Sequence, residues 1–183
     1  MRKSAAAPPP GLAVGLCLTA VFLAACAAPA PSPTPTATAE PTASPDRGTL
    51  SQQLDRGGPI FRLWCISCHG DVGQGLTDEF RATWPPQDQN CWQSKCHNVN
   101  HPPGGFVLPR TVPALVGPTA LSQFRTAADL KAFISAAMPF QEPGVLEDQD
   151  YWDLTALLLS MNHLPLDTSA IGPENADSIQ LGS

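Results

Sequence analysis

The chain has 183 residues, of which 43% are hydrophobic and 14% charged, and its formal net charge at pH 7 is −6. This length fits one globular domain with additional segments, and 21 prolines with 14 glycines are many for a compact domain. The acidic balance excludes a nucleic-acid binder, because a polyanion needs a basic surface, and it favours docking on a basic patch of a protein partner.

Residues 1–25 have the pattern of a bacterial export signal, with Arg2 and Lys3 ahead of an apolar stretch that is too short to span a membrane. The stretch ends in a Leu-Ala-Ala-Cys sequence that resembles the lipobox of bacterial lipoproteins. That resemblance implies cleavage before Cys26 and acylation of this residue, and two or three acyl chains anchor a protein stably. An ordinary cleaved signal or an uncleaved apolar anchor is the alternative.

Residues 26–48 are rich in alanine, proline, threonine and serine and show no apolar periodicity. Such a segment favours extended polyproline II, so we predict a semi-rigid tether that could reach about 60 Å. Together with the signal, it places the folded domain at a cell membrane on the extracytoplasmic side. Thiols tend to oxidise there, so the four cysteines that follow Cys26 should be held in covalent bonds rather than left as free thiols.

Cys65-Ile66-Ser67-Cys68-His69 has the spacing for covalent attachment of one haem c. Each thiol adds to one haem vinyl group, and His69 then lies under the iron as its proximal ligand. A zinc site that adds Cys91 and Cys96 is an alternative, although the spacing of the second pair is loose for zinc. A redox-active dithiol is another, although nothing around the motif indicates a βαβ unit.

The segment before the motif predicts a helix over about residues 56–65, with Pro59 tolerated only in its first turn. Gly57, Phe61 and the haem motif, with glycines after it, resemble the start of a class I cytochrome c. The resemblance implies an all-α fold over residues 49–165.

Two further segments carry the same resemblance. Residues 112–117 (Val-Pro-Ala-Leu-Val-Gly) are similar to the proline loop of class I cytochromes, which implies that the carbonyl of Pro113 accepts the free N–H of His69. The pair Met138-Pro139 is similar to the family's distal-ligand turn, which implies that Met138 is the sixth iron ligand. Met161 and His163 are the alternative ligands.

Two more helices follow from periodicity. Residues 126–129 have the spacing of a capping box, so a helix should begin there and end before Pro139. A last helix should cover about residues 149–162. In class I cytochromes the terminal helix crosses the opening helix, which implies contacts of Gly57 and Phe61 with Tyr151 and Trp152. Residues 166–183 lack periodicity and should form a trailing C-terminal arm.

Residues 78–110 form an insertion that is longer than the core fold requires. It contains Cys91-x4-Cys96-His97, and we predict a Cys91–Cys96 disulfide that closes a short ring. Aromatic side chains of the insertion could then shield the haem edge. C-x4-C-H is also a rarer spacing for haem attachment, so a dihaem protein is the alternative. His97 would be proximal there, with His101 or His163 distal.

These features predict single-electron transfer rather than catalysis, because two axial protein ligands leave no open position on the iron. The expected partners are redox proteins or a membrane quinol-oxidising complex in a respiratory or photosynthetic chain. The resemblance extends to lipid-anchored subunits of such complexes, including alternative complex III, so a fixed relay subunit is a further alternative. An enzyme subunit with a labile axial site is another, and carbon monoxide binding to the reduced protein would distinguish it.

Overall fold

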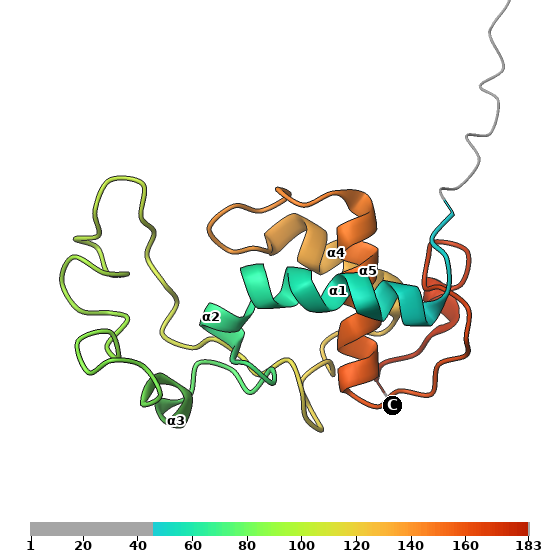
Figure 1. The fold of residues 1–183 in the computed structure, drawn as a ribbon, viewed down its shortest axis with the longest axis horizontal. Coiled ribbons are helices and arrows are strands. Elements are labelled where there is room, and N and C mark those ends of the chain that lie inside the picture. The colour runs from blue at the N-terminus through green and yellow to red at the C-terminus, as the bar shows by residue number, and fades with distance from the viewer. Residues whose placement is uncertain (1–45, 183) are drawn as a thin grey trace, which may run out of the picture. The chain divides into compact units, whose positions relative to one another are not determined.

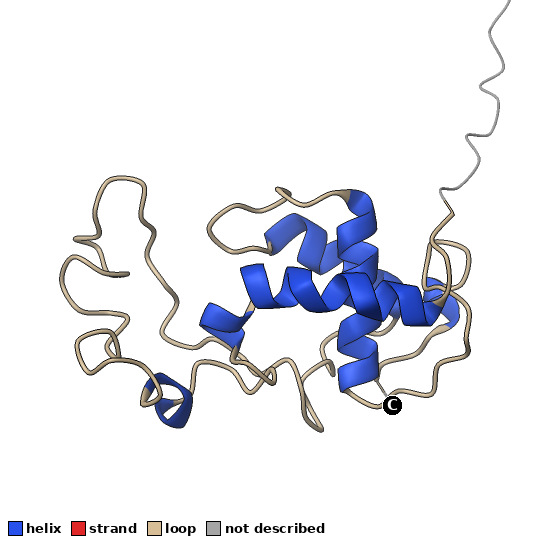
Figure 2. Ribbon diagram, viewed as in Figure 1, coloured by secondary structure: helices blue, strands red, loops and turns tan. Residues whose placement is uncertain are grey.

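The computed structural model describes residues 46–182. The predicted signal (1–25), the lipidation of Cys26 and most of the tether (26–48) lie outside these residues. Within them the structure contains helices and no strand, apart from isolated bridges, which confirms the all-α prediction (Figure 2). None of the helices in this described part is long and apolar enough to cross a membrane.

Helix α1 spans Leu50–Trp64 and begins earlier than predicted (Figure 1). A capping box fixes its start: the Thr49 side chain accepts from the backbone N–H of Gln52, and the Gln52 side chain accepts from that of Thr49. Pro59 therefore lies inside the helix and not in its first turn, so the predicted boundary was wrong. The cap gives the helix a stable start, and packing outweighs the hydrogen bond that proline cannot make.

Helix α5, Asp148–Met161, crosses α1 (Figure 1). A Cβ atom on Gly57 would lie 2.6 Å from the backbone oxygen of Asp153, so only glycine lets the two helices approach this closely. Gly57 thus lies against the backbone of Asp153, and Phe61 belongs to the same core cluster as Tyr151 and Trp152, with which contacts were predicted.

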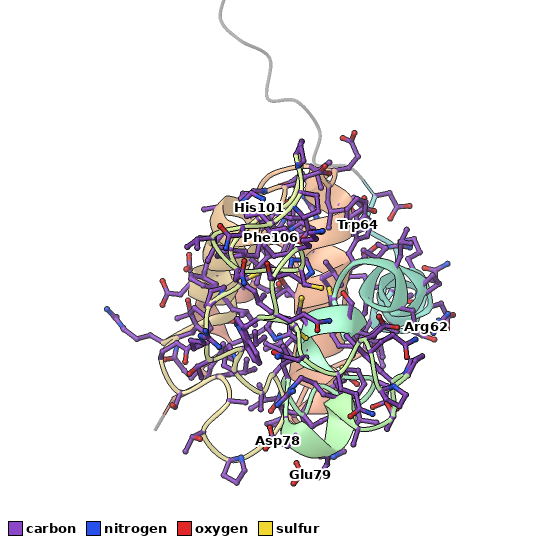
Figure 3. All side chains as sticks on the ribbon, turned by 90° about the vertical axis from the view of Figure 1, so that its left-hand side faces the viewer. Arg62, Trp64, Asp78, Glu79, His101 and Phe106 are labelled. Atoms are coloured by element: carbon purple, nitrogen blue, oxygen red, sulfur yellow. The ribbon has the colours of Figure 1, made fainter. Side chains whose placement is uncertain are left out.

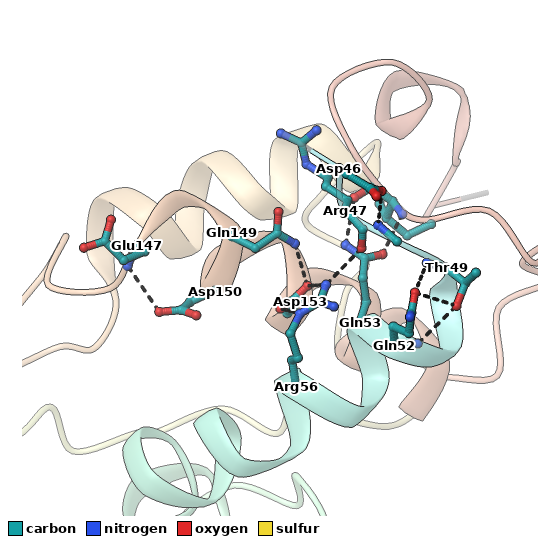
Figure 4. Close-up of polar contacts among 12 residues, drawn as sticks. Asp46, Arg47, Thr49, Gln52, Gln53, Arg56, Glu147, Gln149, Asp150 and Asp153 are labelled. Carbon is teal, nitrogen blue, oxygen red and sulfur yellow. Dashed lines mark hydrogen bonds and ion pairs between the residues drawn. The ribbon is translucent and has the colours of Figure 1, made fainter. Parts of the chain in front are cut away.

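Beside this crossing, Arg56 forms a two-pronged ion pair with Asp153 (Figure 4). Its Nε lies 2.6 Å from Oδ2 and its Nη2 lies 2.8 Å from Oδ1. Gln149 also donates to Asp153 Oδ1 at 2.8 Å. The Asp153 side chain is 1% exposed and that of Arg56 is 42% exposed, so the pair connects α1 to α5 with its carboxylate fully buried.

Helix α4, Ala127–Ala137, confirms the predicted capping box: Thr126 accepts from the N–H of Asp129, and Asp129 accepts from that of Thr126. Its buried side chains include Leu130 and Ile134. They pack with α1 and α5 into the main apolar core. Two short helices, α2 (Ile66–His69) and α3 (Asp78–Arg81), and the 3₁₀ helix η1 (Ala176–Ser178) complete the described helices.

The C-terminal segment is docked, and the prediction of a trailing arm is wrong. The Gln53 side chain donates to the backbone oxygen of Ile171 at 3.0 Å and accepts from its N–H at 2.6 Å. Gln53 and Ile171 are both buried, at 0% and 2% exposure. Further along, Ala127 donates to Ile179 O. Periodicity gave no signal, because this segment is held by backbone groups bonded to distant side chains.

Candidate functional site

An apolar cavity of about 260 Å³ brings the predicted site residues together. Its wall includes side chains of α1, α4 and α5 and the loop between residues 109 and 124. Five predicted residues, which come from three separate parts of the chain, line it: Cys65, Cys68, His69, Pro113 and Met138.

His69 lies at the end of α2 and is 8% exposed. Its Nδ1 is 3.0 Å from the backbone oxygen of Pro113. A carbonyl can only accept, so Nδ1 carries the proton and Nε2 is left as the nitrogen that can ligate a metal. Burial lowers the pKa of His69, while the bond to Pro113 opposes this shift. The ring is therefore held in the neutral form that binds metals.

The loop that supplies Pro113 O is held by backbone bonds and by one side chain that the sequence did not identify. Leu115 donates to Gly73 O at 2.7 Å. Asn162, at the end of α5, donates to Leu115 O at 2.8 Å and accepts from the N–H of Gly117 at 3.2 Å. Gly75 has φ +83°, and a Cβ there would lie 2.9 Å from the backbone of this loop. Asn162 thus connects the last helix to the acceptor of His69, a long-range contact without a local sequence signal.

Met138 is the C-cap of α4 and has an extended backbone. Its backbone oxygen accepts a hydrogen bond of 2.9 Å from the hydroxyl of Tyr151, which is 3% exposed. Tyr151 therefore holds the residue from α5, and sequence reasoning had given it only a packing role. The alternative ligands Met161 and His163 line a different cavity.

The cysteine pair of the cavity consists of uncharged thiols. Burial raises the pKa of Cys65 to about 12 and also raises that of Cys68. A redox-active dithiol needs a lowered pKa, so these thiols do not fit one. Residues 46–182 also contain no group of three histidine, cysteine or acidic side chains placed to hold a metal ion, which argues against the zinc alternative. An apolar cavity with two neutral thiols and a histidine that presents Nε2 fits a covalently attached haem.

The insertion, residues 78–110, begins with α3 and contains no other helix (Figure 2). Figure 3 looks onto it, with His101 and Phe106 labelled. Cys91 and Cys96 are unbonded thiols here, so the predicted disulfide is not formed in the structure. Cys91 belongs to a small apolar cluster with these residues: Leu76, Leu108, Cys68, Phe80, Trp84, Trp92, Phe106 and Val112. Of the predicted shield, Phe106 contacts the cavity wall through the ring of Phe140, at 5.9 Å between centroids.

Three comparisons relate the chain to known proteins. Residues 52–158 match the family described as cytochrome C oxidase, cbb3-type, subunit III. No curated protein matches the chain. Among solved structures, the sulfane dehydrogenase SoxCD from Paracoccus pantotrophus is 24% identical, with a TM-score of 0.43. The match covers 70% of this chain and 52% of that one, so the chain spans about half the length of the solved relative.

Proposed function

The chain belongs to the c-type cytochrome family described as cytochrome C oxidase, cbb3-type, subunit III, and on this basis we propose that it transfers single electrons between redox proteins. A haem c, when bound, supplies an iron that alternates between the ferric and ferrous states. The observation that supports the proposal best is the apolar cavity that brings the haem-binding motif and Met138 together.

The residues of the cavity have separate tasks in this function. Cys65 and Cys68 would attach the haem, and His69 would offer Nε2 to its iron while Pro113 fixes the imidazole ring. Met138 would supply a thioether to the iron, and Tyr151 holds its backbone. A haem held by both His69 and Met138 would leave no position on its iron for a substrate, and the apolar wall would exclude water. These properties suit electron transfer better than catalysis.

Replacing Met138 with alanine tests the sixth ligand. The variant should lose completely the weak near-infrared band of sulfur-to-iron ligation, and its reduction potential should fall, because a thioether raises the potential. Absorption spectroscopy and redox titration measure the two effects. Met161→Leu is the matched control, since Met161 lines the other cavity. A band that survives in Met138→Ala, or is lost in Met161→Leu, would contradict the assignment.

We further propose that the protein acts at the extracytoplasmic face of a bacterial membrane, anchored by lipid on Cys26, and exchanges electrons with a quinol-oxidising or oxidase complex. The support is the sequence pattern of residues 1–48, with its positive start, apolar stretch, Leu-Ala-Ala-Cys sequence and proline-rich tether. The long tether favours a mobile carrier over a fixed subunit, since a fixed subunit needs less reach.

Changing Cys26 to serine should move the protein from the membrane fraction to the soluble fraction, because the acyl chains are attached through this residue. Immunoblots of separated fractions measure the distribution, and Cys17→Ser, within the predicted signal, is the control that should stay membrane-bound. If Cys26→Ser also remains with the membrane, a different anchor or a partner holds the protein there.

A further inference from the structure

The second cysteine–histidine motif, Cys91 to His97, contains a backbone hydrogen bond like one in the first motif. In the first motif the N–H of His69 donates to the oxygen of Cys65 at 2.8 Å. In the second, the N–H of His97 donates to the oxygen of Cys91, also at 2.8 Å. The histidine N–H and the oxygen of the first cysteine are therefore paired in both motifs, although these residues are four positions apart in the first and six in the second.

The two extra residues are absorbed by a turn with an unusual backbone. Lys95, directly before Cys96, has φ +67°, in the left-handed region. This conformation costs a residue with a side chain about 1 kcal/mol. Tight turns flank it, with Gln93 donating to Asn90 O and Cys96 donating to Gln93 O. The left-handed backbone of Lys95 turns the chain so that His97 can bond to Cys91.

The backbone of each histidine is also held in a similar way. The backbone oxygen of His69 accepts from Gly75 at 2.7 Å, and that of His97 accepts from Leu108 at 3.0 Å, so a later loop holds each one. The ring of His97 packs on Phe106 with centroids 4.4 Å apart. Its Nδ1 is buried and has no hydrogen-bond partner. An unpaired buried nitrogen costs about 1–3 kcal/mol, so a group outside the fold that orders this ring would offset that cost.

Three kinds of site could use these residues. A metal ion would need the thiols and the imidazole to converge, and no such convergence exists among residues 46–182. A disulfide would use Cys91 and Cys96. It would not involve His97, whose N–H bonds the oxygen of Cys91 and whose Nδ1 is buried without a partner. A haem uses the three groups at separate points, two at vinyl groups and one at the iron. The first motif does not converge on an ion either, so the lack of convergence at the second motif is compatible with a haem.

Apolar walls are present at the second motif. Cys91 is 7% exposed and packs with Leu76 and Leu108. Trp84, Trp92 and Phe106 border this cluster and offer flat aromatic faces against which a porphyrin can stack. Cys68 of the first motif belongs to the same cluster. A group attached at Cys91 would therefore lie next to the attachment point of the first haem.

We infer that Cys91 and Cys96 attach a second haem c, with His97 as an iron ligand, so that the domain is a two-centre relay. In each attachment the S–H bond adds across a vinyl double bond: sulfur bonds the carbon next to the ring, and the hydrogen goes to the terminal carbon. No electrons are gained or lost, so no oxidant is needed. The inference rests on the proposed function, because it uses the same cofactor.

The full chain, produced in a host that assembles c-type cytochromes, tests this by intact mass under denaturing conditions together with the haem-to-protein ratio. The expected result is a mass increment of two haems and a ratio of two. One haem with two cysteines lacking their hydrogens would overturn the inference in favour of the Cys91–Cys96 disulfide. One haem with two thiols that react with iodoacetamide would also overturn it.

Paired variants separate this inference from the proposed function and need only mass. Cys91→Ser/Cys96→Ser should retain one haem, and Cys65→Ser/Cys68→Ser should also retain one. A wild-type protein with one haem, which Cys65→Ser/Cys68→Ser loses entirely, would overturn the second site and leave the proposed function intact. A wild-type protein without covalent haem would overturn both. Lys95→Gly, which keeps the turn and removes its strain, is the matched control and should retain two haems.

Discussion

Replacing His69 with alanine should abolish the low-spin spectrum of the haem that Cys65 and Cys68 attach, while that haem stays covalently bound. The thioethers do not depend on the imidazole, but the iron loses its proximal nitrogen. Absorption spectroscopy measures the spin state, and haem staining after denaturing electrophoresis measures the attachment. The substitution is made in the Cys91→Ser/Cys96→Ser background, so that only this haem contributes to the spectrum.

The matched control is His163→Gly. His163 lines the other cavity and has φ +55°, which glycine adopts without strain, so this variant should keep the low-spin spectrum. An unchanged spectrum in the His69 variant would show that another residue is the proximal ligand. Loss of the spectrum in the His163 variant would place that residue at the iron.

Replacing Arg56 with methionine should lower the free energy of unfolding by about 3–5 kcal/mol, because it leaves the buried carboxylate of Asp153 without its cation. Gln149 would remain as a donor to Asp153 Oδ1, but an amide does not neutralise the charge. Guanidinium-induced unfolding followed by circular dichroism measures the change. Arg62→Met, on the exposed side of the same helix, is the control and should change stability by less than about 0.5 kcal/mol.

Two outcomes decide whether the unpaired charge of Asp153 causes the loss of stability. The double variant Arg56→Met/Asp153→Leu should recover much of the lost stability, since two apolar side chains can replace a buried ion pair. A loss of less than about 1 kcal/mol in Arg56→Met would mean that water reaches Asp153, and the ion pair would then not be what joins α1 to α5.

The spacing of residues along the chain was sufficient to predict a large part of the site and of the fold. The haem-binding motif of residues 65–69 is contiguous, so its chemistry is readable from residue order alone. The capping box at Thr126 predicted the start of α4, because its two hydrogen bonds join residues three apart. The last helix was predicted within one residue of each end, since its apolar positions repeat over more than three turns.

The resemblance to class I cytochromes supplied what spacing could not. It anticipated the bond between His69 and Pro113 O, which joins residues 44 apart. It also pointed to Met138, and the structure then places that residue in the cavity of His69 and places Met161 in a different one. The predicted start of α1 was wrong because Pro59 was given more weight than the cap at Thr49.

The sequence by itself predicted the residues that we propose attach and ligate a haem, and it determined the helical class and the limits of the last two helices. Only the tertiary structure decided which side chains hold those residues in place: Tyr151 on Met138, Asn162 on the loop of Pro113, and Gln53 on the C-terminal segment. It also decided that the second motif closes like the first. The physical reason is range. Caps, periodicity and attachment motifs depend on neighbours within a few residues, whereas these contacts join chain segments that meet only after the helices have packed.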